Sequence, residues 1–186
     1  MNLKLNFLLF FASILFSTFA TATDSSTAYK LNQGDALLIS VWGEETLNKE
    51  VKVLPDGSIS FPLAGRVDVA NSTSTEVEKR ITEKLKTYLP DPQVTVIITS
   101  IDGNRIYIIG KAVRPGPFIL AGPTTVLQAL SYAGGLDKFA DLDAIKVLRN
   151  VNGTQTTISV NYNKLINGQS LESNIILRTG DTILVP

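Results

Sequence analysis

The chain has 186 residues, with 17 basic and 17 acidic side chains, and it contains neither cysteine nor histidine. These two absences exclude Ser-His-Asp and Cys-His catalysis, and also zinc sites built on histidine or cysteine. The balanced charge lacks the clustered basic face that a nucleic-acid partner requires, so no nucleic-acid partner is expected.

Residues 1–22 have the pattern of a secretory signal peptide. Lys4 precedes an apolar run from Phe7 to Phe19, and Ala20-Thr21-Ala22 supplies small residues at a cleavage site. The alternative is an uncleaved membrane anchor, but this run is shorter than the roughly 18 residues that a spanning helix needs. We therefore predict cleavage after Ala22. Removing Lys4 leaves 16 basic residues against 17 acidic ones, so the net charge of the mature chain is near −1. Because the sequence contains no cysteine, a lipid anchor attached to an N-terminal cysteine is excluded.

The first half of the mature chain predicts strands around one helix. Asp35–Trp42 reads as a buried strand, because most of its side chains are large and apolar. Alternating residues on both sides of Pro55-Asp56-Gly57 predict a hairpin, since proline presets the turn and glycine accepts a positive φ. Residues 92–101 predict another strand, rich in β-branched side chains.

A helix is predicted between these strands. Its apolar residues recur at helical spacing, and the pairs Thr73–Glu76 and Thr75–Glu78 are alternative capping boxes. The face of this helix that we expect to be buried consists of Val77, Ile81, Leu85 and Tyr88.

Asp102-Gly103-Asn104 is the predicted seam between two units. After it, strands are expected at 105–110 and from Phe118 onward, followed by a helix capped by Thr124 or Thr125 and ended by Gly134-Gly135. Asn152-Gly153 predicts a type I′ turn between two further strands, with a longer loop as the alternative. Residues 161–174 are expected to be a loop, and Thr182–Val185 a final strand.

Two turns of similar sequence lie near the ends of the mature chain. Gly34-Asp35 and Gly180-Asp181 each follow a leucine and two other residues, and each precedes aliphatic residues. Glycine permits a tight turn and aspartate can accept hydrogen bonds from nearby amides, so we interpret both pairs, like Pro55, Asp56 and Gly57, as structural.

Little else in the sequence points to chemistry. The acids are scattered without a fixed pair, Asp141 and Asp143 are too few for calcium, and no phosphate-binding glycine loop is present. We therefore expect no cofactor, no metal and no enzymatic activity. Aromatic and planar polar groups could hold a sugar, although each is more often used in packing. The candidates are Trp42, Tyr107, Arg114, Phe118 and Tyr132.

Several motifs together resemble a known family. "YKLNQGDALLISVW", "VKVLPDGSISFPLAGRVDVA" and "DPQVTVII" resemble the N-terminal domain of bacterial polysaccharide export proteins. "IYIIGKAVRPGPFIL", "TTVLQALSYAGGL", "VLRN" and "LRTGDTILVP" resemble the soluble-ligand-binding β-grasp domain that follows it. The resemblance implies an α+β fold of two small units. The export domain would span 29–101 and the ubiquitin-like β-grasp domain 104–186.

The resemblance also implies a function. Family members are non-enzymatic parts of a machine that exports capsule or exopolysaccharide. Large members form octameric rings around a cavity. The expected partners are a polysaccharide, an inner-membrane polysaccharide copolymerase and further copies of the chain. This sequence has one β-grasp domain, no lipidated cysteine and no closing membrane helix. We therefore expect an outer-membrane pore-forming protein as a further partner, or action wholly in the periplasm.

The family's signature loops supply the candidate contact residues. They are Arg114, Pro115, Gly116, Gly134 and Gly135. The glycines and the proline also suit plain turns, whereas a turn does not need a guanidinium, so Arg114 is the residue we expect to contact glycan or a neighbouring subunit. Two other functions stay open: a stand-alone glycan-binding module that retains polymer at the surface, and a carboxylate-dependent glycan hydrolase or lyase.

Overall fold

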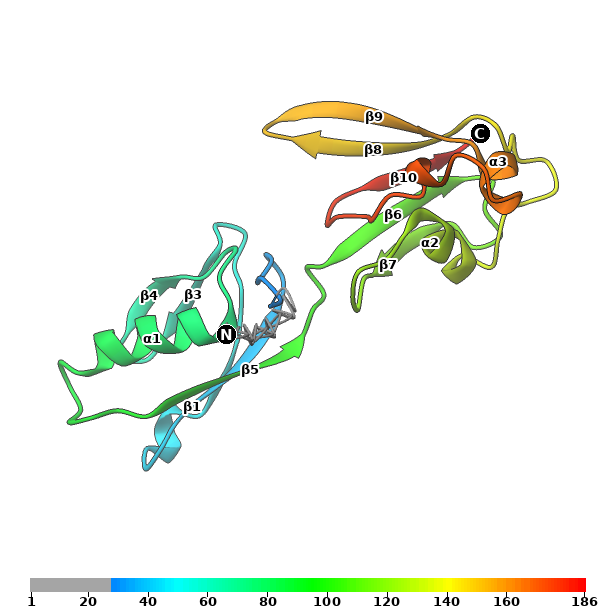
Figure 1. The fold of residues 1–186 in the computed structure, drawn as a ribbon. Coiled ribbons are helices and arrows are strands. Elements are labelled where there is room, and N and C mark those ends of the chain that lie inside the picture. Colours follow the sequence, from blue (N-terminus) through cyan, green and yellow to red (C-terminus); the bar gives the residue numbers. More distant parts are fainter. Residues whose placement is uncertain (1–27) are drawn as a thin grey trace, which may run out of the picture.

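A computed structural model describes residues 28–186. The predicted signal peptide and its cleavage site lie outside these residues. Figure 1 shows two units at opposite ends of the molecule, with strand β5 (Val94–Ser100) leading into strand β6 (Arg105–Gly110) between them. Each unit has its own hydrophobic core, and no residue belongs to both cores. The predicted α+β fold of two small units is confirmed.

The N-terminal unit, residues 28–101, contains two small sheets and one long helix. The sheet with strand order β2-β1-β5 combines β1 (Ala36–Val41), β2 (Lys49–Lys52) and β5, all antiparallel, and the 3-10 helix η1 (Glu45–Leu47) joins β1 to β2. The second sheet pairs β3 (Ser58–Phe61) with β4 (Gly65–Asp68).

Helix α1 (Ser74–Leu85) packs on this unit through one face. Of the two capping boxes considered, Thr73–Glu76 forms, with the Thr73 hydroxyl accepting from the Glu76 amide and the Glu76 carboxylate accepting from the Thr73 amide. Val77, Ile81 and Leu85 are fully buried. Tyr88 was predicted on the same face but is 59% exposed, because it lies beyond the end of the helix.

The Pro-Asp-Gly hairpin prediction was wrong in its strands, although the turn forms. Gly57 has a φ of 80°, and its amide bonds to the Leu54 carbonyl at 2.9 Å. The strands on either side belong to different sheets, since β2 pairs with β1 and β3 with β4. Next to the turn the Leu54 amide donates to the Ser58 carbonyl at 2.8 Å, but the Val53 amide donates to the Asp35 carbonyl, so the chain before the turn continues the β1–β2 pairing.

The C-terminal unit, residues 104–186, is built on a five-stranded sheet. The strand order is β7-β6-β10-β8-β9, in which β10 (Thr182–Val185) runs parallel to β6 and antiparallel to β8. The first and last strands thus lie side by side at the centre of the sheet, as in a β-grasp fold. The other strands are β7 (Gly116–Ile119), β8 (Ile145–Val151) and β9 (Thr154–Val160).

Three short helical segments complete this unit. Helix α2 (Val126–Tyr132) begins at a capping box formed by Thr125 and Gln128. The 161–174 segment, predicted as a loop, instead contains α3 (Tyr162–Ile166) and the 3-10 helix η2 (Leu171–Ser173). The side chain of Asn161 caps α3 and Leu165 anchors it in the core, two signals that the polar composition of the segment obscured.

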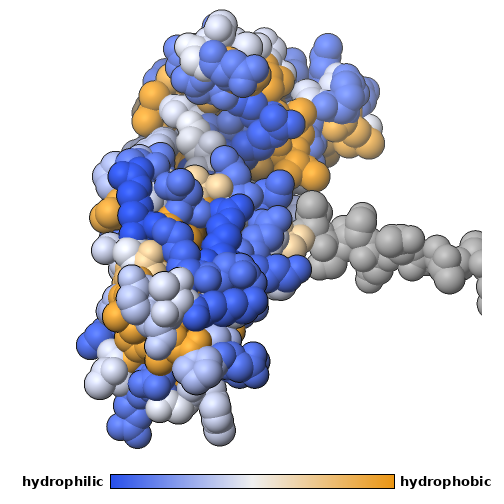
Figure 2. All heavy atoms as spheres, turned by 90° about the vertical axis from the view of Figure 1, so that its left-hand side faces the viewer, coloured by the Kyte–Doolittle hydropathy of each residue, from blue (hydrophilic) through white to orange (hydrophobic). Residues whose placement is uncertain are grey.

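Among residues 28–186, no helix is both long and apolar enough to cross a membrane. Figure 2 shows a face of the molecule that is mostly hydrophilic, with hydrophobic atoms gathered in separate patches.

Candidate functional site

The two Gly-Asp turns have the same hydrogen-bond geometry. In residues 32–35, Asp35 Oδ2 accepts from the Asn32 amide at 2.7 Å, and the Asp35 amide donates to the Asn32 carbonyl at 3.2 Å. In residues 178–181, Asp181 Oδ2 accepts from the Arg178 amide at 2.8 Å, and the Asp181 amide donates back to the Arg178 carbonyl at 3.0 Å. The glycine before each aspartate has a positive φ, which a side chain would disfavour.

The remaining bonds of the two carboxylates differ. Asp35 also accepts from the Tyr29 hydroxyl at 2.8 Å and, through Oδ1, from the Gly103 amide at 2.9 Å. Asp181 forms a bidentate pair with Arg149, at 2.9 Å from Nε and 2.7 Å from Nη2. Both carboxylates are fully buried, so these bonds replace the water that each charge would otherwise require.

Each of the two aspartates contributes to a raised pKa of a neighbouring side chain, Tyr29 beside Asp35 and Arg149 beside Asp181. Burial raises the pKa of the Tyr29 hydroxyl well above its usual range, a hydrogen bond from Asn32 opposes this rise, and Asp35 adds to it. The hydrogen bond to Asp181 raises the pKa of the Arg149 guanidinium, while burial acts in the opposite direction. The two buried aspartates are therefore tied into structural networks.

The junction between the units is held by both turns. Gly103 fits tightly: a Cβ there would lie 2.3 Å from the Gln33 carbonyl oxygen and 2.8 Å from Asp35 Oδ1. On the other side, the Gly180 amide donates to the Arg105 carbonyl at 2.8 Å, and the Thr179 hydroxyl bonds to the Asn104 side chain. The linker thus contacts the first Gly-Asp turn at Gly103, and it contacts the second Gly-Asp turn at Asn104 and Arg105.

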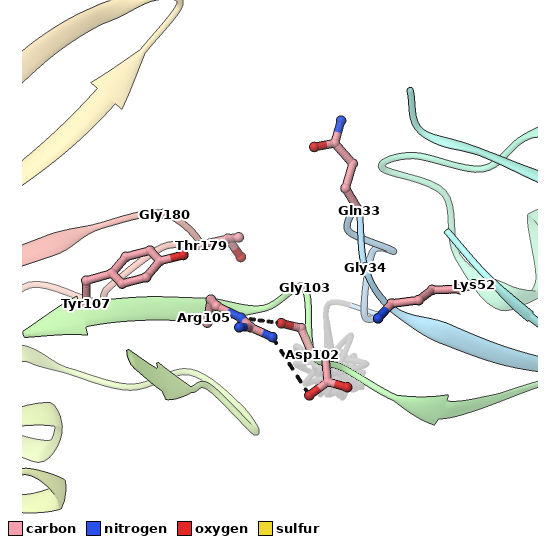
Figure 3. A pocket seen from close by; sticks show the side chains of 9 residues that line it. All are labelled: Gln33, Gly34, Lys52, Asp102, Gly103, Arg105, Tyr107, Thr179 and Gly180. Carbon is pink, nitrogen blue, oxygen red and sulfur yellow. Dashed lines mark hydrogen bonds and ion pairs between the residues drawn. The ribbon is translucent and has the colours of Figure 1, made fainter. Parts of the chain in front are cut away.

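A cleft of about 320 Å³ lies at this junction. Figure 3 shows that its walls come from both units. We call it the junction cleft, and its lining residues are Gln33, Gly34, Lys52, Asp102, Gly103, Arg105, Tyr107, Thr179 and Gly180.

The junction cleft carries polar groups that are free to bind a ligand. Within residues 28–186, the side chains of Gln33, Lys52 and Tyr107 form no hydrogen bond or ion pair. Arg105 is held in place, since its Nε donates to the Asp102 carbonyl at 2.5 Å and its Nη2 lies 3.9 Å from Asp102 Oδ1. Two cations, a phenol and an amide suit a hydroxyl-rich or acidic ligand. The seam and Tyr107 were predicted from the sequence, whereas Lys52 and Arg105 were not, because only the fold brings these two residues to the same cleft.

The predicted signature loops meet at a second place, in the C-terminal unit. The Arg114 amide donates to the Ala133 carbonyl at 2.9 Å, and the Val113 amide donates to the Gly135 carbonyl at 3.1 Å. Gly134 and Gly135 both have positive φ, 79° and 90°, where α2 ends. We call residues 111–116 the Arg114 loop. It and the Gly134-Gly135 segment form one surface, apart from the junction cleft.

Arg114 has a structural partner on this surface. Its Nη2 donates to the Tyr132 carbonyl at 2.6 Å and so satisfies a carbonyl at the end of α2. This bond gives the guanidinium a structural role, which the sequence did not predict. Arg114 and Pro115 are nevertheless exposed, while Gly116 is half-buried with a φ of 146°.

The aromatic candidates are dispersed. Trp42, which was predicted to lie in a buried strand, is 87% exposed. It directly follows β1, and the alternation along that strand leaves its side chain outside the core. Tyr132 is 50% exposed beside the Arg114 loop, and Phe118 is half-buried on β7. Phe139, which was not predicted as a candidate, is 70% exposed.

Two family models match the chain in succession. The model described as "Polysaccharide biosynthesis/export protein" matches residues 23–99. The model described as "SLBB domain" matches residues 104–185. The two matches meet at the seam that contains Gly103.

Curated relatives match over most of this chain. They include the EPS I polysaccharide export outer membrane protein EpsA of Ralstonia nicotianae, 30% identical over 86% of this chain and 48% of its own length. The polysialic acid transport protein KpsD of Escherichia coli is 28% identical over 84% of this chain and 28% of its own. The capsule polysaccharide export outer membrane protein CtrA of Neisseria meningitidis is 25% identical over 82% of this chain and 43% of its own. The chain spans about half the length of these relatives or less.

Proposed function

Since the chain belongs to the bacterial polysaccharide export family, we propose that it is a component of the machinery that carries a capsule or exopolysaccharide out of the cell. The observation that supports this proposal best is the succession of the two domain matches, which together cover residues 23–99 and 104–185. The printed names of the relatives all concern polysaccharide export, transport or production.

We propose a non-enzymatic role in the periplasm, in association with the outer membrane. The printed names of EpsA and CtrA, which both include the outer membrane, support the proposed location. The proposed partners are the polysaccharide, an inner-membrane polysaccharide copolymerase, an outer-membrane pore-forming protein and further copies of the chain, assembled as a ring.

Two surfaces are proposed to contact the glycan or a neighbouring subunit. The Arg114 loop with Gly134-Gly135 offers an exposed guanidinium beside the half-exposed ring of Tyr132. The junction cleft offers Lys52, Arg105 and the Tyr107 hydroxyl, which suit the hydroxyl and carboxylate groups of a sugar chain.

Deletion of the coding sequence tests the export role. We expect polymer outside the cell to fall and intact polymer to accumulate in the periplasm, with both effects reversed by the parental chain. Polymer that is released into the medium instead of staying on the cell would favour the alternative, a surface-retention module. The 87% exposure of Trp42 is the observation in favour of that alternative, because aromatic faces commonly hold sugars. Shortening of polymer by the purified protein would contradict a non-enzymatic role.

A further inference from the structure

The junction cleft brings cations of the two units onto facing walls. Arg105 and Tyr107 are alternate residues of β6, so their side chains leave the same face of the strand, while Ile106 and Ile108 are buried in the core on the other face. Lys52 comes from β2 of the N-terminal unit, and Figure 3 shows its side chain reaching toward the linker from the opposite wall. A ligand in the cleft would therefore lie between positive charges of both units.

The Arg105 guanidinium is fixed in place but keeps its terminal nitrogens available. Its Nε donates to the Asp102 carbonyl at 2.5 Å, which sets the plane of the group. Within residues 28–186 neither terminal nitrogen donates a hydrogen bond, since the ion pair from Nη2 to Asp102 Oδ1 spans 3.9 Å, too far for one. The terminal nitrogens of a guanidinium match the two oxygens of a carboxylate, a planar pairing that lysine cannot make. The fold thus holds a bidentate donor ready at the junction.

Lys52 adds a positive charge that has no counter-ion. Among residues 28–186 its ammonium forms neither an ion pair nor a hydrogen bond. Asp102 is the one acid among the described residues that line the cleft, and its Oδ2 already accepts from the Ser100 hydroxyl at 2.6 Å. The lining therefore carries two cations, Lys52 and Arg105, against one carboxylate, which leaves a net charge of +1. Such a site attracts anions in preference to neutral groups.

The neutral groups of the cleft suit the remainder of a sugar. The Tyr107 hydroxyl and the Gln33 amide can each donate and accept a hydrogen bond, and neither has a partner within residues 28–186. The cleft volume of about 320 Å³ lies at the lower end of the roughly 300–1,000 Å³ typical of ligand pockets. A cleft of this size accommodates a single small unit, such as one sugar ring with its carboxylate.

Given the proposed export function, on which this inference rests, we propose that the junction cleft binds a sugar acid of the exported polymer, and that this polymer is an acidic polysaccharide. The carboxylate lies against the free edge of Arg105 and the ammonium of Lys52, while ring hydroxyls bond to Tyr107 and Gln33. Because Lys52 belongs to one unit and Arg105 to the other, the bound sugar acid also bridges the seam between the units.

Binding of acidic polymers to the purified full chain tests this site. Calorimetric titration at low salt uses polygalacturonate, hyaluronate and polysialic acid, each beside its carboxyl-reduced form, which is neutral but otherwise the same chain. We expect at least one acidic polymer to bind and its reduced form not to bind. Equal binding of an acidic polymer and its reduced form would overturn the proposal, because the carboxylate would then contribute nothing. Failure of all the acidic polymers to bind would overturn it as well.

Substitutions assign the binding to the cleft. Lys52→Gln is expected to weaken binding on the order of tenfold, because a charge-assisted contact is lost. Lys49→Gln makes the same change of charge on an exposed residue of the same strand that does not line the cleft, and is expected to bind like the parent. Equal losses in these two variants would show attraction by overall charge and would contradict the assigned site.

Two further variants change the cleft in opposite directions. Asp102→Asn removes the opposing charge and keeps the shape of the side chain, so binding of an acidic polymer is expected to strengthen about threefold. Tyr107→Phe removes a hydroxyl and is expected to weaken binding about threefold. Weaker binding in Asp102→Asn, with the fold intact by circular dichroism, would contradict a carboxylate in this cleft.

Failure of this proposal can be told apart from failure of the proposed function. Calorimetry uses purified protein and needs no export machinery, whereas the deletion experiment measures export alone. If deletion blocks export but no acidic polymer binds, the sugar-acid site is wrong and the export role stands. If acidic polymer binds at the cleft but deletion leaves export unchanged, the export role is wrong and the site belongs to a glycan-binding module.

Discussion

The carboxylate of Asp35 accepts a hydrogen bond from the amide of Gly103, 68 residues away, at 2.9 Å. This bond joins the first Gly-Asp turn to the linker between the two units. The second turn bonds to the adjacent residues of the same linker, so the two similar sequence motifs hold a single junction.

Removing the Asp35 carboxylate leaves three donors on half-buried residues without an acceptor. They are the amides of Asn32 and Gly103 and the hydroxyl of Tyr29. Asp35→Ala is therefore expected to lower the free energy of unfolding by about 2–4 kcal/mol. Denaturant titration measures the change. Asp68→Ala removes an 84% exposed carboxylate and serves as the control, with an expected change within about 0.5 kcal/mol.

Gly103→Ala tests the close approach at the junction. The added Cβ would lie 2.3 Å from the Gln33 carbonyl oxygen, so the linker must move away from the first turn, at a cost of about 1–3 kcal/mol. We expect faster proteolysis at the linker and a larger maximum dimension in small-angle scattering. Gly122→Ala, where a Cβ meets nothing within 4 Å, is the matched control. Equal protease resistance in the two variants would contradict the tight junction.

Gly57→Ala is expected to cost at least about 1 kcal/mol, because Gly57 has a φ of 80°. Its Cβ would also lie 2.7 Å from the Cβ of Ala70. Gly43→Ala separates the two effects, since Gly43 has nearly the same φ, 79°, with nothing within 4 Å. Thermal denaturation should show a larger loss for Gly57→Ala than for Gly43→Ala. Equal losses would mean that Ala70 yields without cost.

The raised pKa of Tyr29 predicts sensitivity to alkali. Above the ordinary pKa of 10.0, the unfolded chain releases the Tyr29 proton while the folded chain retains it. The folded state then binds more protons, so the free energy of unfolding falls as the pH rises above about 10. Tyr29→Phe lacks this titration and should show a shallower fall between pH 8 and pH 11 in denaturant titrations. Lysine and other tyrosine residues titrate in both proteins, so parallel curves would exclude the contribution of Tyr29.

Arg114→Ala separates a structural from a functional role of the Arg114 loop. Loss of the bond to the Tyr132 carbonyl is expected to cost about 0.5–1.5 kcal/mol, which leaves the chain folded. The proposed function predicts that assembly or export falls more than this small loss of stability explains. Lys146→Ala removes an exposed cation of β8, outside the Arg114 loop, whose side chain makes no bond within the described residues, and is the control. A variant that assembles and exports like the parent would leave Arg114 with its capping role alone.

Local patterns in the sequence predicted most of the elements. The helical spacing of Val77, Ile81 and Leu85 depends on neighbours a few residues apart, as do the Thr73–Glu76 capping box and the cap at Thr125. The turn preferences of Gly57 and of Asn152-Gly153 are equally local. Such features can be read without knowledge of the fold.

Features that depend on distant partners could not be predicted. The strand before Gly57 was assigned to the wrong sheet because the Asp35 carbonyl binds the Val53 amide, a contact across 18 residues that no turn signal reveals. The Arg149–Asp181 pair likewise forms only when the C-terminal unit is folded. Lys52 and Arg105 line the same junction cleft only when the two units are in place. The resemblance to the export family supplied the order of the domains but not these contacts.

The export role is tested most directly by following polymer through the cell after the chain is depleted. Sugar precursor is labelled in a short pulse, and the label is then measured in the periplasm and outside the cell at successive times. The proposed function predicts that labelled polymer of full length accumulates in the periplasm while its appearance outside slows, and that the parental chain restores the rate. Label that leaves the periplasm at the parental rate after depletion would contradict the proposed function.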